Sequence, residues 1–162
     1  MAKRVLLVLT TNDDGGSATR DAAGVARAAG GTVRVMCVHP LPRPRVDRYD
    51  RTVADVDREM ARVTTTALAR LEASTADVRD VPIERVVRFG RLGRELAIEA
   101  AVFRADLVAL AAPPRPSLRH RLQAWYLERI ALGSAVRLVV LPMPVARGER
   151  GAAETTVVAA LR

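Results

Sequence analysis

The sequence has few of the residues on which several common classes of protein depend. Its 162 residues include a single cysteine, Cys37, so the chain has no internal disulfide. Aromatic residues make up only 3%, and the core must therefore be built from Val, Leu, Ile and Ala. No apolar run reaches the roughly 18 residues of a membrane-spanning helix, and the start of the sequence lacks a signal peptide's apolar region. We expect a cytoplasmic, disulfide-free protein without a membrane partner.

Positive charge is abundant, but it is spread along the whole chain. The net charge is +8, and every basic residue except Lys3 is arginine. The arginines are mixed with Asp and Glu, and no stacking aromatics accompany a basic stripe, as they do in single-strand-binding proteins. We interpret the charge as a solvated basic surface. Nucleic-acid binding is the weaker alternative, and steeply salt-dependent retention on DNA would support it.

Apolar runs alternate with amphipathic stretches along most of the chain. Residues 5–9 are continuously apolar, which is typical of a parallel strand covered on both faces. Residues 53–71 place apolar side chains three and four apart, which predicts one face of a long helix. Strands linked to helices by short connections predict an α/β fold, an open parallel sheet with helices on both faces. The expected strands lie near residues 4–10, 33–38, 83–89, 107–111 and 136–141, and the expected helices near 17–29, 53–71, 92–103 and 117–132.

The connections also predict the order of the strands. Two right-handed crossover units that meet at a switch point give a five-stranded sheet in the order 3-2-1-4-5. We assign residues 1–145 to one domain with this sheet. Residues 146–162 begin with a polar Arg- and Gly-rich stretch and form a C-terminal tail, whose end is either an extra edge strand or frayed.

Several short stretches, in order and at ungapped spacing, resemble the universal stress protein family over residues 3–142. The first helix is rich in alanine and ends at Gly30, and Val87 to Gly90 match a Val-x-x-Gly element. Ala105 begins a stretch similar to the family's Ala-Asp-Leu-Ile-Val-Met strand. This resemblance implies a fold of the adenine nucleotide alpha hydrolase type, a role in the stress response and a homodimer formed through the fifth strand.

The nucleotide-binding motif of that family is lost at the matching positions. Family members that bind nucleotides carry Gly-x2-Gly-x9-Gly-[Ser/Thr] after the fourth strand, because backbone N–H groups must approach the phosphates closely. The four positions here are Ala111, Pro114, Ala124 and Trp125. Pro114 has no N–H to donate, and Trp125 places an indole where a small hydroxyl would meet a phosphate. We expect no ATP binding in the family's manner and no cofactor.

The crevice beyond the carboxyl ends of the strands is the candidate ligand site, because open parallel sheets bind ligands there. The candidate residues are Thr10, Thr11, Asn12, Val38 and Arg115. The resemblance assigns the first three to the positions of the family's Asp and Gly-Ser, and Val38 to the adenine-facing position. Arg115 would hold an anion by its charge. Solvated loop and helix residues, and an ordinary core residue at Val38, explain the same pattern.

The sequence contains no catalytic constellation and no metal-ligand spacing. It has no Walker loop and no Gly-x-Ser-x-Gly elbow. Its two histidines, His39 and His120, are not spaced with Cys37 as metal ligands. We expect His39 to end a strand and Cys37 to be a buried, inert thiol. The chain is therefore predicted not to be an enzyme.

These observations favour a regulatory or protective protein that acts as a homodimer through contacts with an unidentified protein partner. The expected fifth strand is almost wholly apolar and lies at an edge of the predicted sheet. We expect it to pair with the same strand of a second copy. The alternative is a nucleotide- or small-anion-binding protein that uses a rebuilt loop after the fourth strand.

Overall fold

Strands and helices alternate along the chain, as the sequence pattern predicts. The structure is a computed structural model that describes residues 3–9, 15–43, 45–46, 52–112 and 137–142. The expected helix near 117–132 and the tail at 146–162 lie outside the described residues. The elements are β1 (Arg4–Leu9), α1 (Gly16–Ala28), β2 (Thr32–His39), β3 (Arg45–Val46), β4 (Thr52–Ala54), α2 (Val56–Thr75), β5 (Ile83–Phe89), α3 (Leu92–Phe103), β6 (Leu107–Ala112) and β7 (Arg137–Pro142).

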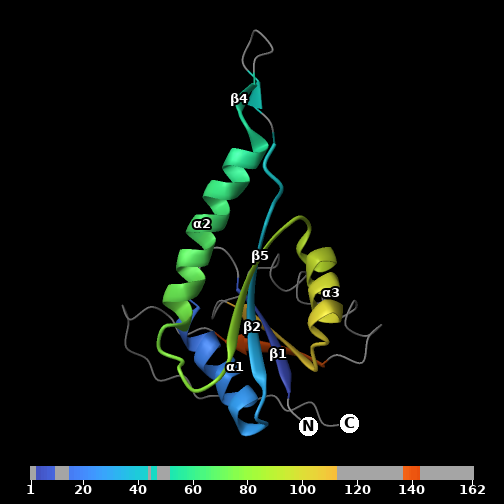
Figure 1. Cartoon of the computed structure of the whole chain (residues 1–162). Coiled ribbons are helices and arrows are strands. Elements are labelled where there is room, and N and C mark those ends of the chain that lie inside the picture. The colour runs from blue at the N-terminus through green and yellow to red at the C-terminus, as the bar shows by residue number, and fades with distance from the viewer. Residues whose placement is uncertain (1–2, 10–14, 44, 47–51, 113–136, 143–162) are drawn as a thin grey trace, which may run out of the picture.

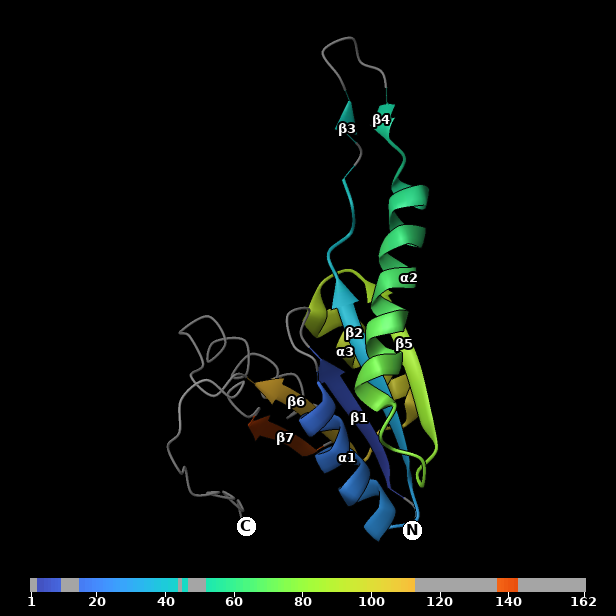
Figure 2. The same cartoon turned by 90° about the vertical axis from the view of Figure 1, so that its left-hand side faces the viewer.

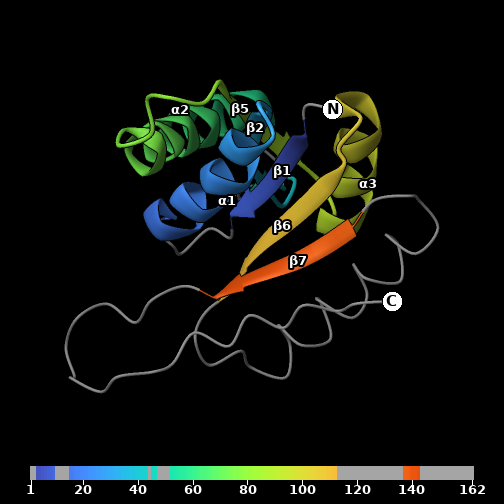
Figure 3. The ribbon, with the colours of Figure 1, turned by 90° about the horizontal axis from the view of Figure 1, so that it is seen from below.

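The main sheet has the strand order β5-β2-β1-β6-β7, and every neighbouring pair in it is parallel. β1 lies at its centre, where Val5 is in register with Val33 of β2 and with Leu107 of β6. The predicted α/β class, the parallel pairing and the order 3-2-1-4 of the first four expected strands are confirmed. β7 lies beside β6 at the outside of the sheet (Figure 3).

Helices cover both faces of the sheet, and the alternating side chains of its strands build two apolar clusters (Figure 3). Val5, Leu7 and Leu9 of β1 pack on one face with the buried alanines of α1 and with Leu71 of α2. On the other face, a second cluster contains α3 side chains and residues of three strands. Its buried members are Leu6, Val8, Met36, Leu96, Phe103, Ala105, Val108 and Leu110. Burial on both faces explains why the strands are continuously apolar.

The start of α1 differs from the prediction that Ser17 caps the helix. The helix begins at Gly16, and its N-cap is Gly15, which has a φ of 64° and makes no side-chain capping bond. A Cβ on Gly15 would lie 2.5 Å from the side chain of Leu9. Only glycine combines this left-handed conformation with so close an approach. The chain's entry into α1 is thus set by its packing on β1.

The segment around Val53 is also different from the sequence prediction. Val53 lies in β4, which pairs antiparallel with β3 in a separate two-stranded sheet. α2 begins only after Asp55, whose carboxylate accepts a hydrogen bond of 3.0 Å from the N–H of Asp57. This N-cap competes successfully with the apolar spacing that predicted an earlier start. The β3–β4 hairpin and the first half of α2 extend past the rest of the molecule (Figures 1 and 2).

Candidate functional site

The carboxyl ends of the parallel strands lie along one edge of the sheet, where the sequence places its candidate crevice. Val38 is the only one of the five candidate residues that the structure describes; Thr10, Thr11, Asn12 and Arg115 lie outside the described residues. Val38 is half-buried and packs against the apolar cluster on the α3 face. This placement agrees with its interpretation as a core residue.

The next described position of the lost nucleotide motif is Ala111, at the end of β6. Its side chain is buried in the cluster that also contains Leu9 and Cys37. A glycine here would leave the backbone open to a phosphate, whereas the alanine methyl group fills the core. The other three motif positions, Pro114, Ala124 and Trp125, lie outside the described residues.

The thiol of Cys37 lies next to this site and is unreactive at neutral pH. It is 6% exposed, and burial raises its pKa to about 11, although the nearby positive charge of Arg70 acts in the opposite direction. Because the thiolate is the reactive form, a thiol with this pKa is protonated and inert at pH 7. The expectation of a buried, inert cysteine is confirmed.

His39 closes β2, as predicted, and connects it to the end of β5. Its carbonyl accepts a hydrogen bond of 2.8 Å from the N–H of Gly90, and its ring centroid lies 6.1 Å from that of Phe89. Partial burial, and then the positive charge of Arg70, lower the pKa of the imidazole. His39 is therefore neutral at pH 7. Its contacts are those of a strand end, and no carboxylate orients it as a base.

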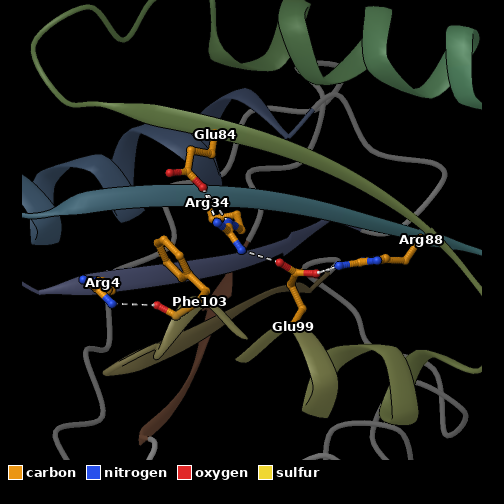
Figure 4. A network of polar contacts seen from close by, with 6 residues as sticks. All are labelled: Arg4, Arg34, Glu84, Arg88, Glu99 and Phe103. Atoms are coloured by element: carbon orange, nitrogen blue, oxygen red, sulfur yellow. Dashed lines mark hydrogen bonds and ion pairs between the residues drawn. The ribbon is translucent and has the colours of Figure 1, made fainter. Parts of the chain in front are cut away.

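A buried carboxylate on the opposite face of β2 was not found from the sequence. Glu99 of α3 is 1% exposed, and both of its oxygens are paired (Figure 4). Oε1 accepts a hydrogen bond from Nη1 of Arg34 in β2. Oε2 accepts two from Arg88 in β5, at 2.8 Å from Nε and 2.5 Å from Nη2. The charge of Glu99 is thus held between two guanidinium groups.

Arg34 makes two further contacts within this network. Its Nε donates to Glu84 of β5 at 2.7 Å, and its guanidinium carbon lies 4.2 Å from the centre of the Phe103 ring (Figure 4). Burial disfavours the charged form of Arg34, but the bonds to Glu84 and Glu99 outweigh it and raise the pKa. We call Arg34, Glu84, Arg88 and Glu99 the ion-pair network. It ties α3 to β2 and β5 with bidentate geometry that arginine provides and lysine does not.

Two signals in the sequence could have revealed the ion-pair network. Glu99 shares the buried face of α3 with Leu92, Leu96 and Phe103, at spacings of seven, three and four residues. A single carboxylate on an otherwise apolar helix face needs a partner when buried. Arg34 interrupts an apolar strand in the same way. Their pairing could not be read from the sequence, because it joins residues 65 positions apart.

The outer edge of the sheet at β7 has a different character. The sequence of β7 between Arg137 and Pro142 is wholly apolar. Val139 is 40% exposed, although it belongs to a strand of the main sheet. In the described part of the chain, β7 has a partner strand on one side only, which leaves an open strand edge.

Two searches of the described residues set limits on other functions. They contain no helix that is long and apolar enough to cross a membrane. They also contain no group of three or more His, Cys, Asp or Glu side chains that could hold a metal ion.

An open parallel sheet with helices on both faces, and a crevice at a switch in strand order, defines a doubly wound α/β protein. The chain belongs to the universal stress protein family, whose family model matches residues 1–142. No curated protein matches the chain. Its motif positions therefore have no annotated relative for comparison.

Solved structures with a similar fold come from the same family. A family protein from Burkholderia pseudomallei has a TM-score of 0.61 at 14% identity, covering 88% of this chain and 97% of its own. A universal stress protein in complex with cAMP has a TM-score of 0.58 at 17% identity, covering 87% and 98%. One from Archaeoglobus fulgidus in complex with dAMP has a TM-score of 0.51 at 15% identity, covering 86% and 97%. At these identities the likeness establishes the fold alone.

Proposed function

We propose that this chain is a cytoplasmic stress-response protein that acts through protein contacts as a homodimer, without ATP as a cofactor and without enzymatic activity. The observation that carries the proposal is the apolar edge of β7 with its exposed Val139. Exposed apolar edges of this kind pair with other chains. Antiparallel pairing of β7 with its symmetry mate satisfies both edges through a two-fold axis.

The change Val139→Arg tests the dimer. A charge at the centre of the β7 edge would be desolvated if two copies paired there, so the variant should be monomeric. Light scattering should report twice the mass of one chain for the wild type at micromolar concentration and the mass of one chain for the variant. Val25→Arg is the matched control, because Val25 is 38% exposed on α1. A wild-type chain that is monomeric under these conditions would refute the dimer.

The loss of the glycine motif supports the proposal that ATP is not a ligand. Ala111 fills the core at one motif position, and Pro114 has no N–H at the next. Thermal unfolding should therefore be unchanged by millimolar ATP. A ligand at 100 times its Kd would add about 2.7 kcal/mol of stability, which the same measurement detects easily.

The alternative function is the binding of a different nucleotide or small anion in the crevice. Two family members are solved with cAMP and with dAMP, so these compounds belong in the same thermal unfolding experiment. A concentration-dependent rise in Tm with either compound would favour the alternative. Mass spectrometry of compounds released from the denatured protein would then identify the natural ligand. No rise with any of the three would leave protein contacts as the function.

A further inference from the structure

The most exposed part of the molecule is a projection that the main sheet does not support. It consists of residues 41–43, 45–46 and 52–66, which we call the overhang. Figures 1 and 2 show it extending beyond the ends of the strands, with the β3–β4 hairpin at its tip. β3 and β4 pair only with each other, in a sheet of their own. A two-stranded hairpin by itself is only marginally stable in water.

The two halves of α2 differ in the same way. All four buried residues of this helix, Ala67, Leu71, Ser74 and Thr75, lie in its second half. The first half continues the same apolar line upward through Val63, Met60 and Val56, at the helical spacing of three and four residues. These three side chains are only half-buried, because the sheet ends below them.

The opposite limb of the overhang adds exposed apolar surface and a stiff backbone. Leu41 is 60% exposed. It stands between Pro40 and Pro42, whose rings fix φ near −65° and favour an extended chain. A stiff segment loses little conformational entropy when it binds. The overhang therefore presents apolar side chains on two limbs at little cost of ordering.

The charges of the two limbs identify the partner. The limb at residues 41–46 carries Arg43 and Arg45 and no acidic residue. The limb at residues 52–59 has a net charge of −2, from Asp55, Asp57 and Glu59 against Arg58. Nucleic acid or an anionic membrane would be attracted by one limb and repelled by the other. A surface with equal and opposite charges on its two limbs is complementary to itself.

We propose that the overhang is a second self-association surface, whose partner is the overhang of another copy of this chain. In such a two-fold contact, the basic limb of each copy lies against the acidic limb of the other, and the α2 stripes meet at the centre. The contact is separate from β7, since α2 packs beside β5 at the opposite edge of the sheet (Figure 2). The overhang is small, so the association is weak and appears above the concentration at which β7 pairs.

Disulfide crosslinking in the Val139→Arg background tests this contact without the β7 dimer. Met60→Cys adds one thiol on the apolar stripe, while Ala61→Cys adds one at the neighbouring, exposed position of the same helix. The native thiol, Cys37, is buried and does not compete. Under mild oxidation Met60→Cys should form a covalent dimer several times faster than Ala61→Cys. Equal rates for the two variants would overturn the proposal.

A charge exchange provides a test that does not depend on the new thiols. Arg43→Glu and Asp57→Arg, each alone in the Val139→Arg background, place like charges opposite each other and should weaken dimerisation about tenfold. The double variant should restore it. Sedimentation velocity over a range of concentrations measures both effects. Failure of the double variant to recover, or Arg43-dependent and salt-sensitive retention on DNA, would overturn the proposal. Neither outcome depends on whether β7 pairs, because that edge is already blocked.

Discussion

The two outer strands of the main sheet, β5 and β7, face the same problem in opposite ways. Both present a strand edge that has no partner among the described residues. β5 carries charged side chains at Glu84, Arg85 and Arg88, and two of these belong to the ion-pair network. β7 is apolar between its ends and exposes Val139.

This difference indicates which edge is open to another chain. Charged side chains on an edge strand oppose edge-to-edge pairing, because a partner strand would desolvate them. On β5 they are also fixed in place, since Glu84 and Arg88 are bonded to neighbouring elements and Arg85 donates to the hydroxyl of Thr75 at 2.7 Å. β7 has no comparable protection. The proposed dimer therefore uses the β7 edge.

The largest expected effect comes from breaking the ion-pair network beneath β5. Glu99→Gln preserves the shape of the side chain but removes the charge that two guanidinium groups share. Removing one partner of a buried ion pair costs about 3–5 kcal/mol of the free energy of unfolding. Urea denaturation should show this loss, while Glu72→Gln, at an exposed position of α2, should change it by less than about 0.5 kcal/mol. A loss as small as that of the control would mean that the network does not hold α3 to the sheet.

A smaller effect is expected when the β5 edge is made similar to β7. The double change Glu84→Val and Arg85→Val removes two exposed charges and should allow β5 to pair with other chains. We expect self-association to strengthen about a hundredfold, which corresponds to about 2.7 kcal/mol. Light scattering should then detect species larger than the wild-type assembly.

The control for the β5 variant is Glu72→Val with Arg79→Val, which removes the same two charges from exposed positions outside the sheet. It should keep the wild-type mass. If both double variants assemble to the same extent, general surface hydrophobicity and not the strand edge decides the association.

The smallest expected effect is that of Arg88→Gln. Arg88 is 39% exposed, so solvent screens its bond to Glu99, and Arg34 continues to neutralise that carboxylate. We expect a loss of about 1 kcal/mol in urea denaturation. A loss equal to that of Glu99→Gln would show that Arg88 is the principal counter-ion of Glu99 and that β5 is fixed more firmly than its exposure suggests.

Most of the fold could be predicted because the signals that determine it are local. The apolar run at residues 5–9 and the three- and four-residue spacing in α3 each need only a few neighbouring residues. The start of α2 was predicted wrongly because Val53 fits both the helical spacing and the short strand β4. The choice was made by the cap at Asp55, a hydrogen bond that competes locally with the helix.

The sequence by itself determined the α/β class, the parallel pairing, the inert Cys37 and the loss of glycine at Ala111. Only the tertiary structure decided that Glu99 lies between Arg34 and Arg88, and that β5 is protected while the exposed side of β7 is not. Electrostatic pairing depends on distances between residues that are far apart in the chain, and those distances exist only after the sheet and α3 have packed.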